Sequence, residues 1–195
     1  MLLLLTLFSP ALAADEAPSP AARQAEAVRL SAELHEATRS AKWKAAERYY
    51  IAAVATGMPL AATAHFEASE AARTRGDLGA VRDRLIAALT IDPTHDQAAA
   101  ALSALDRSYG QVKLASVPGA TLEDYEHPFD PNAIRAVDHA IAALAETGRF
   151  TGLLPPGPYS IDGDPFEVVA GKLTVLDLSP PPVPPAEKKP WWRGR

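Results

Sequence analysis

Residues 36–93 read EATRSAKWKAAERYYIAAVATGMPLAATAHFEASEAARTRGDLGAVRDRLIAALTIDP, and this stretch decides the fold. Alanine matches carry little weight in an alanine-rich chain, but five other identities share a single offset. These identities are Glu36/Glu70, Arg39/Arg73, Arg48/Arg82, Thr56/Thr90 and Pro59/Pro93. A period of about 34 residues is typical of a repeated pair of helices joined by a turn. The sequence therefore predicts two successive helical hairpins.

Apolar residues at helical spacing extend this pattern to five helices. Gly57 stops the second helix and Pro59 sets the first turn of the third, because glycine ends helices and proline fits their start. The residues Arg75-Gly76-Asp77 form the next turn. We expect the fifth helix to close the stack with a polar outer face. The predicted helices cover residues 22–39, 41–56, 60–74, 78–90 and 95–108.

The fourth and fifth helices resemble a tetratricopeptide (TPR) repeat. The residues that carry the resemblance are Gly76-Asp77, Ala80, Leu85, Ala88, Asp92-Pro93, His95 and Ala98. Small residues such as Ala46 and Ala80 would lie where paired helices touch. One hairpin cannot bury its apolar face alone, so neighbouring hairpins would stack. The resemblance implies a TPR-like domain over residues 22–108 that offers a surface to a partner.

The pattern changes after Tyr109-Gly110 to the alternation of a half-buried strand, at Val112, Leu114 and Ser116. Asp130-Pro131 predicts a helix over residues 131–147, because aspartate caps the free amides and proline fits the first turn. Gly148 would end this helix. We expect residues 122–129 to form a loop. Further strands are predicted at residues 150–154, 159–161, 166–169 and 173–178.

This second half resembles a small β-sandwich of the PEGA or carboxypeptidase-regulatory type. The resemblance rests on Gly110-x-Val-x-Leu114, Pro118-Gly119-Ala120, Gly152-x-Leu154 and Leu154-Pro-Pro-Gly-Pro-Tyr159. It implies a non-enzymatic extracytoplasmic module over residues 109–178, although the helix at 131–147 departs from the usual sandwich. The predicted fold class is therefore α+β, with antiparallel helical hairpins followed by a small β-sandwich-like domain.

The two ends of the chain carry separate signals. Residues 1–13 have an apolar core that Pro10 breaks, followed by Ala11-Leu12-Ala13, the small-x-small pattern of a signal-peptide cleavage site. They lack the usual basic residues, so a buried apolar helix or a longer leader are the alternatives. We expect a cleaved signal and a bacterial protein that is periplasmic, secreted or at the cell surface, with a linker at residues 14–21.

Residues 179–195 form a proline-rich tail that ends in basic and aromatic residues. Paired tryptophans flanked by cations resemble the edge of a membrane-spanning segment. Three interpretations stay open: contact with a membrane surface or a protein, a position just before an anchor, or a solvated tail. The residues concerned are Lys188, Lys189, Trp191, Trp192 and Arg193.

Composition and motifs argue against several classes of function. The net charge of −5 disfavours nucleic-acid binding, and the absence of cysteine excludes disulfides and thiolate chemistry. The sequence has no zinc-binding histidine pair, nucleophile elbow, phosphate loop or dinucleotide fingerprint. We interpret Asp162-Gly163-Asp164 as a hairpin turn rather than a calcium loop. We expect no metal, no cofactor and no enzymatic activity.

The sequence therefore predicts a non-catalytic interaction or scaffold protein of the bacterial envelope that binds a protein or peptide. The first candidates for partner contact are Arg39, Tyr50, Arg73 and Arg84. The alternative is a cell-wall or polysaccharide-binding module in the β-half, with stacking by Tyr125, Phe150 and Tyr159. A third hypothesis, the least favoured, is an enzyme that uses the region from Asp124 to His139.

Overall fold

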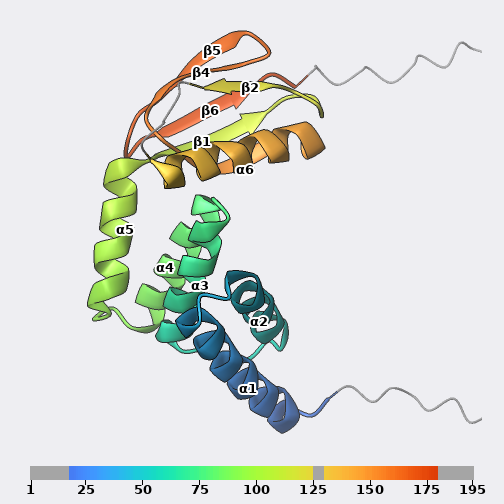
Figure 1. The fold of residues 1–195 in the computed structure, drawn as a ribbon, viewed down its shortest axis with the longest axis vertical. Helices are drawn as coiled ribbons and strands as arrows, with labels where there is room; N and C mark the ends of the chain where they lie inside the picture. The colour runs from blue at the N-terminus through green and yellow to red at the C-terminus, as the bar shows by residue number, and fades with distance from the viewer. Residues whose placement is uncertain (1–17, 125–129, 180–195) are drawn as a thin grey trace, which may run out of the picture.

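The computed structural model describes residues 18–124 and 130–179 of the chain. Five helices packed pairwise are followed by a small two-sheet β region with one inserted helix (Figure 1), which confirms the predicted α+β class. The helices are α1 (Pro20–Arg39), α2 (Trp43–Ala55), α3 (Ala62–Thr74), α4 (Leu78–Ile91), α5 (Asp96–Ser108) and α6 (Pro131–Thr147).

Several helix ends follow the chemistry read from the sequence. The Asp130 side chain accepts hydrogen bonds from the amides of Asn132 and Ala133, and Gly148 ends α6 in the left-handed conformation. The predicted span of α6 is confirmed. The second helix begins two residues later than predicted, because Ala41 has a left-handed backbone with φ 52° and cannot belong to a helix.

Equivalent residues in the turns of the two hairpins are one residue further apart in the sequence than the five identities predict. Ala41 and Gly76 occupy equivalent positions, and both adopt the left-handed conformation. The next amide in each turn donates to the carbonyl five residues earlier, at 2.8 Å in the first hairpin and 3.2 Å in the second. Buried positions follow the same longer offset: Ala27/Ala62, Leu34/Ser69, Ala37/Ala72, Ala46/Val81 and Ala53/Ala88.

The offset of the five identities returns before the fifth helix. The chain has six residues between α2 and α3 but only four between α4 and α5. Helix α4 is one residue longer than α2. The stretch from the start of α4 to the start of α5 is therefore one residue shorter than the stretch from the start of α2 to the start of α3. Pro59 and Pro93 therefore occupy equivalent positions, each three residues before a helix, while the other four identities lie one residue out of structural register.

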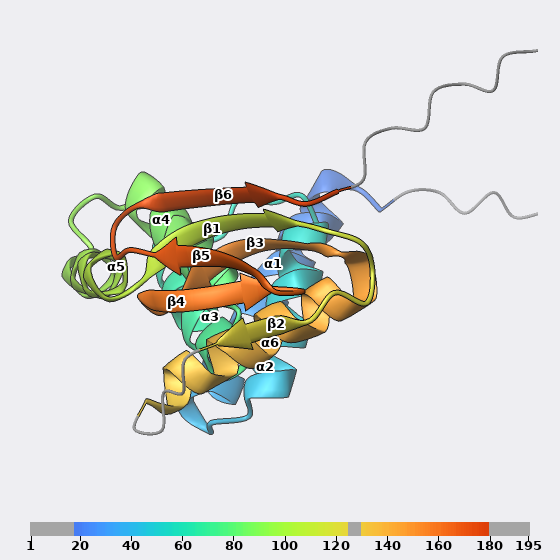
Figure 2. The same ribbon diagram turned by 90° about the horizontal axis from the view of Figure 1, so that it is seen from above.

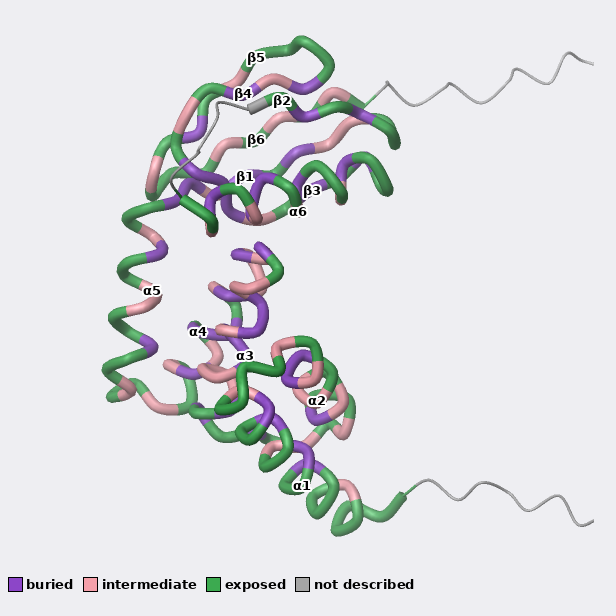
Figure 3. Tube along the Cα trace, in the orientation of Figure 1, coloured by how far each residue is buried: buried purple, intermediate pink, exposed green. Residues whose placement is uncertain are grey.

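Helix α5 and the β region together cover the second hairpin. Ala98 and Leu105 of α5 are buried in the apolar core around α3 and α4, and Figure 3 shows most of the rest of this helix exposed. The expectation that α5 packs on the stack with a polar outer face is therefore confirmed. The same core also includes Ala136 of α6 and Leu153 of strand β3, so the β region covers the hairpin beside α5.

Gly76 lets the turn between α3 and α4 contact α6 directly. A Cβ atom on Gly76 would overlap the backbone carbonyl group of Arg135. Its φ of 79° is also a conformation that favours glycine. The helical half and the β region thus meet at backbone contact distance and share one core.

The β region consists of two three-stranded sheets. The first has the order β3-β1-β6, with β1 and β6 parallel, and the second has the order β2-β4-β5. Figure 2 shows the strands from above, with β6 along the outer edge. The strands are β1 (Gly110–Ala115), β2 (Leu122–Asp124), β3 (Arg149–Leu154), β4 (Gly157–Ile161), β5 (Asp164–Val168) and β6 (Leu173–Asp177).

The core of the β region lies between the two sheets and α6. Val137 and Leu144 of α6 pack there against buried strand residues from both sheets. Residues 122–124 form a short strand where a loop was predicted, because Leu122 is buried and pairs with Ile161. The turn at Asp162 and Gly163 is confirmed, since both have positive φ and join β4 to β5.

The predictions for both ends of the chain concern residues outside the described part. These are the signal at residues 1–13 and the basic, aromatic residues after residue 179. Among the helices of the described ranges, none is both long and apolar enough to cross a membrane.

Candidate functional site

A hollow of about 590 Å³ surrounds Trp43 at the turn between α1 and α2. The left-handed backbone of Ala41 turns the chain sharply, so that Trp43 opens α2 beside the end of α3. Trp43 packs partly against the core of the first hairpin and contributes the rest of its surface to the hollow. The lining residues are Ala41, Lys42, Trp43, Lys44, Ala45, Thr74 and Arg75.

Three of these lining residues are cations. Lys42 and Lys44 are exposed, and neither forms an ion pair with any residue of the described ranges. Arg75 is 44% exposed; its Nη2 lies 2.9 Å from Glu47 Oε1 and 3.8 Å from Asp77 Oδ2. The hollow therefore combines an aromatic wall with positive charge that is only partly compensated.

Glu47, which bonds Arg75, also forms a buried ion pair with Arg84. Glu47 and Arg84 are both nearly buried, and Arg84 donates to both carboxylate oxygens of Glu47 at 2.7 Å. Arg84 also donates to the carbonyl of Ala68 at 2.7 Å. Burial alone would raise the pKa of Glu47, but the bonds and charges of Arg84 and Arg75 outweigh it and lower that pKa.

Tyr50 and His65 extend this network across α2, α3 and α4. The guanidinium of Arg84 lies 4.3 Å from the ring centroid of Tyr50, which is cation–π distance. The Tyr50 hydroxyl lies 3.0 Å from Nδ1 of His65. Burial, together with the charge of Arg84, lowers the pKa of His65, and burial raises the pKa of Tyr50. The neutral imidazole is therefore the favoured form, able to accept a hydrogen bond from the Tyr50 hydroxyl.

The four residues predicted to contact a partner do not form one site. Tyr50 and Arg84 lie together, but Arg84 is only 8% exposed and its donors are used inside the protein. Arg39 lies on the exposed end of α1, bonded to Glu36, and Arg73 lies 3.4 Å from Glu70. None of the four lines the hollow around Trp43.

Sequence reasoning missed the cations of the hollow. The signal was present as the tripeptide Lys42-Trp43-Lys44, in which two cations flank an aromatic residue. The third cation, Arg75, belongs to the turn of the other hairpin and joins Lys44 only through the packing of the hairpins. Its position could not be read from local spacing.

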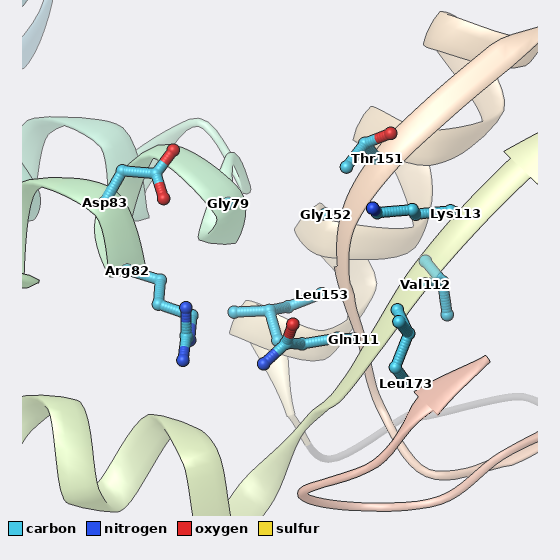
Figure 4. A pocket seen from close by; sticks show the side chains of 10 residues that line it. All are labelled: Gly79, Arg82, Asp83, Gln111, Val112, Lys113, Thr151, Gly152, Leu153 and Leu173. Carbon is cyan, nitrogen blue, oxygen red and sulfur yellow. The ribbon is translucent and has the colours of Figure 1, made fainter. Parts of the chain in front are cut away.

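A second, smaller groove lies between α4 and the outer face of the first sheet (Figure 4). Figure 4 shows Arg82 extending from α4 toward Gln111 and Leu153. Gly79 approaches Gly152 so closely that a Cβ there would lie 3.4 Å from the Gly152 Cα. The groove has a volume of about 110 Å³, well below the ~300–1,000 Å³ of typical ligand sites. The hollow around Trp43 is thus the better candidate.

None of the described residues of the polysaccharide-binding and enzyme hypotheses lines the hollow around Trp43. Phe150 and Tyr159 belong to the core of the β region, so neither offers a ring face to a sugar, and Tyr125 lies outside the described residues. His139 contacts Phe150 edge-on and lies 3.8 Å from Asp77 Oδ1, while Asp138 is exposed. In the described part of the chain, no group of three or more histidine and carboxylate residues could hold a metal ion.

Comparisons of this chain with models of known protein families, with curated proteins and with solved structures found no match. The resemblances to TPR repeats and to PEGA-type modules therefore stay predictions.

Proposed function

We propose that this chain is a non-catalytic interaction protein of the bacterial envelope, which holds an acidic segment of a partner protein in the hollow around Trp43. The observation that carries the proposal is the arrangement of three cations around a partly exposed tryptophan in a hollow of about 590 Å³. This volume lies within the range of ligand-binding pockets. A short peptide could place one or two side chains there.

The local charge favours an acidic segment. Lys42, Lys44 and Arg75 lie around the hollow, and none of its lining residues is acidic. Screening limits the reach of surface charges to about 8–10 Å at physiological salt, so a short peptide responds to these cations more than to distant charges. An extended anionic surface, such as a membrane or a nucleic acid, would also meet the net charge of −5. A peptide is therefore the better fit.

The chemistry of the lining supports binding rather than catalysis. It contains no carboxylate, histidine or cysteine that could exchange protons or attack a substrate near neutral pH. The only hydroxyl among the lining side chains, that of Thr74, donates to the carbonyl of Ala71 at 2.8 Å. What the lining offers is positive charge and apolar surface, which are the requirements for recognising an acidic and partly apolar segment.

The location in the envelope rests on the predicted export signal at residues 1–13. The TPR-like resemblance adds the expectation of a protein or peptide partner. We propose that this partner binds at the hollow, on the helical half of the chain.

A peptide titration tests the proposal. The probe is a labelled ten-residue peptide of alternating glutamate and leucine, and its fluorescence anisotropy is followed as the protein is added. We expect binding that weakens with salt and is largely lost when Lys42→Glu and Lys44→Glu are combined. Lys113→Glu combined with Lys172→Glu, an equal change of charge at two exposed lysines outside the hollow, serves as the control and should bind almost as the unaltered protein does.

The comparison also shows what would contradict the proposal. Equal losses for the Lys42/Lys44 variant and for the Lys113/Lys172 control would mean that the peptide senses only overall charge. Equal binding of a peptide with glutamine in place of glutamate would show that acidity is not what the hollow recognises. Reduced binding with an unchanged circular dichroism spectrum ties the loss to the hollow rather than to the fold.

A further inference from the structure

Strand β6 leaves one edge of the first sheet open. It pairs only with β1 among the described strands, and Figure 2 shows it along the outer edge. Exposed edges promote pairing with other chains, and proteins usually protect them with charges, prolines or bulges. Residues 173–176 read Leu-Thr-Val-Leu and contain none of these protective features, and the one charged residue of the strand, Asp177, lies at its end. This edge is therefore competent to accept another strand.

The hydrogen-bond pattern shows which residues would accept it. The amide of Gln111 donates to the carbonyl of Lys172 at 2.8 Å, and the amide of Leu178 donates to that of Ala115 at 2.7 Å. Backbone groups in a parallel ladder alternate in direction. Thr174 and Leu176 consequently face β1, and the amides and carbonyls of Leu173, Val175 and Asp177 face away from the sheet.

The exposed side chains of the same residues are apolar. Leu173 is 53% exposed and Val175 is 64% exposed, both on the outer face of the sheet. The opposite face of β6 is partly occupied, because the Thr174 hydroxyl donates to the carbonyl of Glu167 on β5. An added strand would cover apolar surface on the outer face while it satisfies the free backbone groups.

The chain's own tail is a poor occupant for this edge. Five of the six residues after Ser179 are proline, and proline has no amide to donate. A second copy of the chain is a good occupant because the edge is self-complementary. Leu173 and Asp177 each lie two residues from Val175, so a two-fold axis at Val175 brings every free amide of one copy to a carbonyl of the other.

We propose that two copies of this chain pair in antiparallel fashion through β6, with Val175 meeting Val175 on the two-fold axis. A two-fold interface pairs a strand with its own copy in the opposite direction. In this register Leu173 of one copy lies opposite Asp177 of the other, so the two Asp177 carboxylates stay apart, whereas parallel pairing would bring them together. The β3-β1-β6 sheets of the two copies become one six-stranded sheet. The proposal is independent of the hollow around Trp43.

Single cysteines test this arrangement, because the chain has no cysteine of its own. Directly opposed residues in a hydrogen-bonded antiparallel pair have Cα atoms about 5.5 Å apart, which suits a disulfide. Under mild oxidation of the full chain, Val175→Cys should form a covalent dimer rapidly. Val117→Cys, which is 45% exposed in the turn after β1, is the matched control and should remain largely monomeric.

The register gives a second check. Two copies of residue 173 would lie about 13 Å apart across the axis, too far for a disulfide. Leu173→Cys alone should therefore cross-link slowly, and a mixture of Leu173→Cys with Asp177→Cys should cross-link rapidly. Faster self-linking of Leu173→Cys than of Val175→Cys would overturn the proposed axis.

Light scattering measures the association without cysteines. The unaltered chain should move toward twice its monomer mass as its concentration rises, and Val175→Lys should stay at the monomer mass with an unchanged melting temperature. A chain that remains monomeric at millimolar concentration, or a Val175→Cys variant that cross-links no faster than Val117→Cys, would overturn the proposal.

Discussion

At the scale of single residues, the buried pair of Glu47 and Arg84 determines how the first two hairpins fit together. Arg84 reaches from α4 to Glu47 on α2 and to the carbonyl of Ala68 on α3. A buried ion pair need not stabilise a protein relative to apolar residues, but removing one partner leaves an uncompensated charge. Arg84 is thus better explained as a structural residue than as a contact for a partner.

Replacement of Arg84 by methionine should therefore cost about 3 kcal/mol of unfolding free energy, as measured by urea denaturation. Arg39→Met removes the exposed partner of Glu36 and should leave the unfolding free energy almost unchanged, because exposed pairs contribute little. Similar losses for the two variants would show that the buried pair has no special structural role.

His65 should make stability depend on pH. Its pKa in the folded protein is lowered by burial and by Arg84, whereas the unfolded value is about 6.5. Between these two pKa values the unfolded chain binds more protons, so the free energy of unfolding falls as the pH decreases below about 6.5. Above that pH the contribution of His65 is fully present.

Melting temperatures measured from pH 7.5 down to pH 5 should consequently decrease in the unaltered protein. In His65→Gln the decrease should be shallower, because glutamine can still accept a hydrogen bond from Tyr50 but does not titrate. An identical pH profile for both proteins would rule out this role of His65.

At the scale of elements, the turn between α3 and α4 joins the two halves of the molecule. Gly76 needs both its positive φ and its lack of a Cβ, since the carbonyl of Arg135 occupies the space beside it. Gly57 also has a positive φ of 69°, but a Cβ there would meet only an arginine nitrogen at 4.0 Å. Alanine substitutions at the two glycines therefore separate the cost of the left-handed backbone from the cost of the contact with α6.

Gly57→Ala should lose about 1 kcal/mol of stability from its left-handed backbone. Gly76→Ala should lose at least about 2 kcal/mol more, because α6 must also move away. Both values can be measured by chemical denaturation. Equal losses would show that the close approach to α6 is absent in solution.

The sequence predicted the elements better than their register. Chemical signals at single residues, such as Asp130-Pro131 and Gly148, were sufficient for the bounds of α6. The offset that aligns Glu36 with Glu70 failed across the hairpin turns, because all five of its identities lie outside the packed core. Buried alanines and leucines do repeat at the longer offset, but an alanine-rich chain hides that pattern among chance matches.

At the scale of the whole molecule, the helical half and the β region form one body. Leu153 of β3 and Ala136 of α6 share the core of the second hairpin with Ala98 and Leu105 of α5. No local sequence pattern indicates such a contact, because it depends on residues that are far apart along the chain. The predicted division at residue 109 therefore marks a change of secondary structure within a shared core.

The candidate site was only partly predictable for the same reason. The prediction pointed to arginines and aromatic residues on the helical half. It identified Arg84, whose partner Glu47 also bonds Arg75, and Tyr50, whose ring contacts Arg84. The residues at the surface of the hollow were missed, because Arg75 approaches Lys42 and Lys44 only when the hairpins pack.

The emission of Trp43 is the most direct measure of whether the hollow receives an acidic segment. The other two tryptophans, Trp191 and Trp192, lie in the tail, so replacing both by phenylalanine leaves Trp43 as the sole tryptophan. Addition of the glutamate–leucine peptide should then shift its emission to shorter wavelength and protect it from iodide quenching, with saturation at the concentration where anisotropy saturates. An unchanged spectrum at saturating peptide would contradict the central claim that this hollow is the binding site.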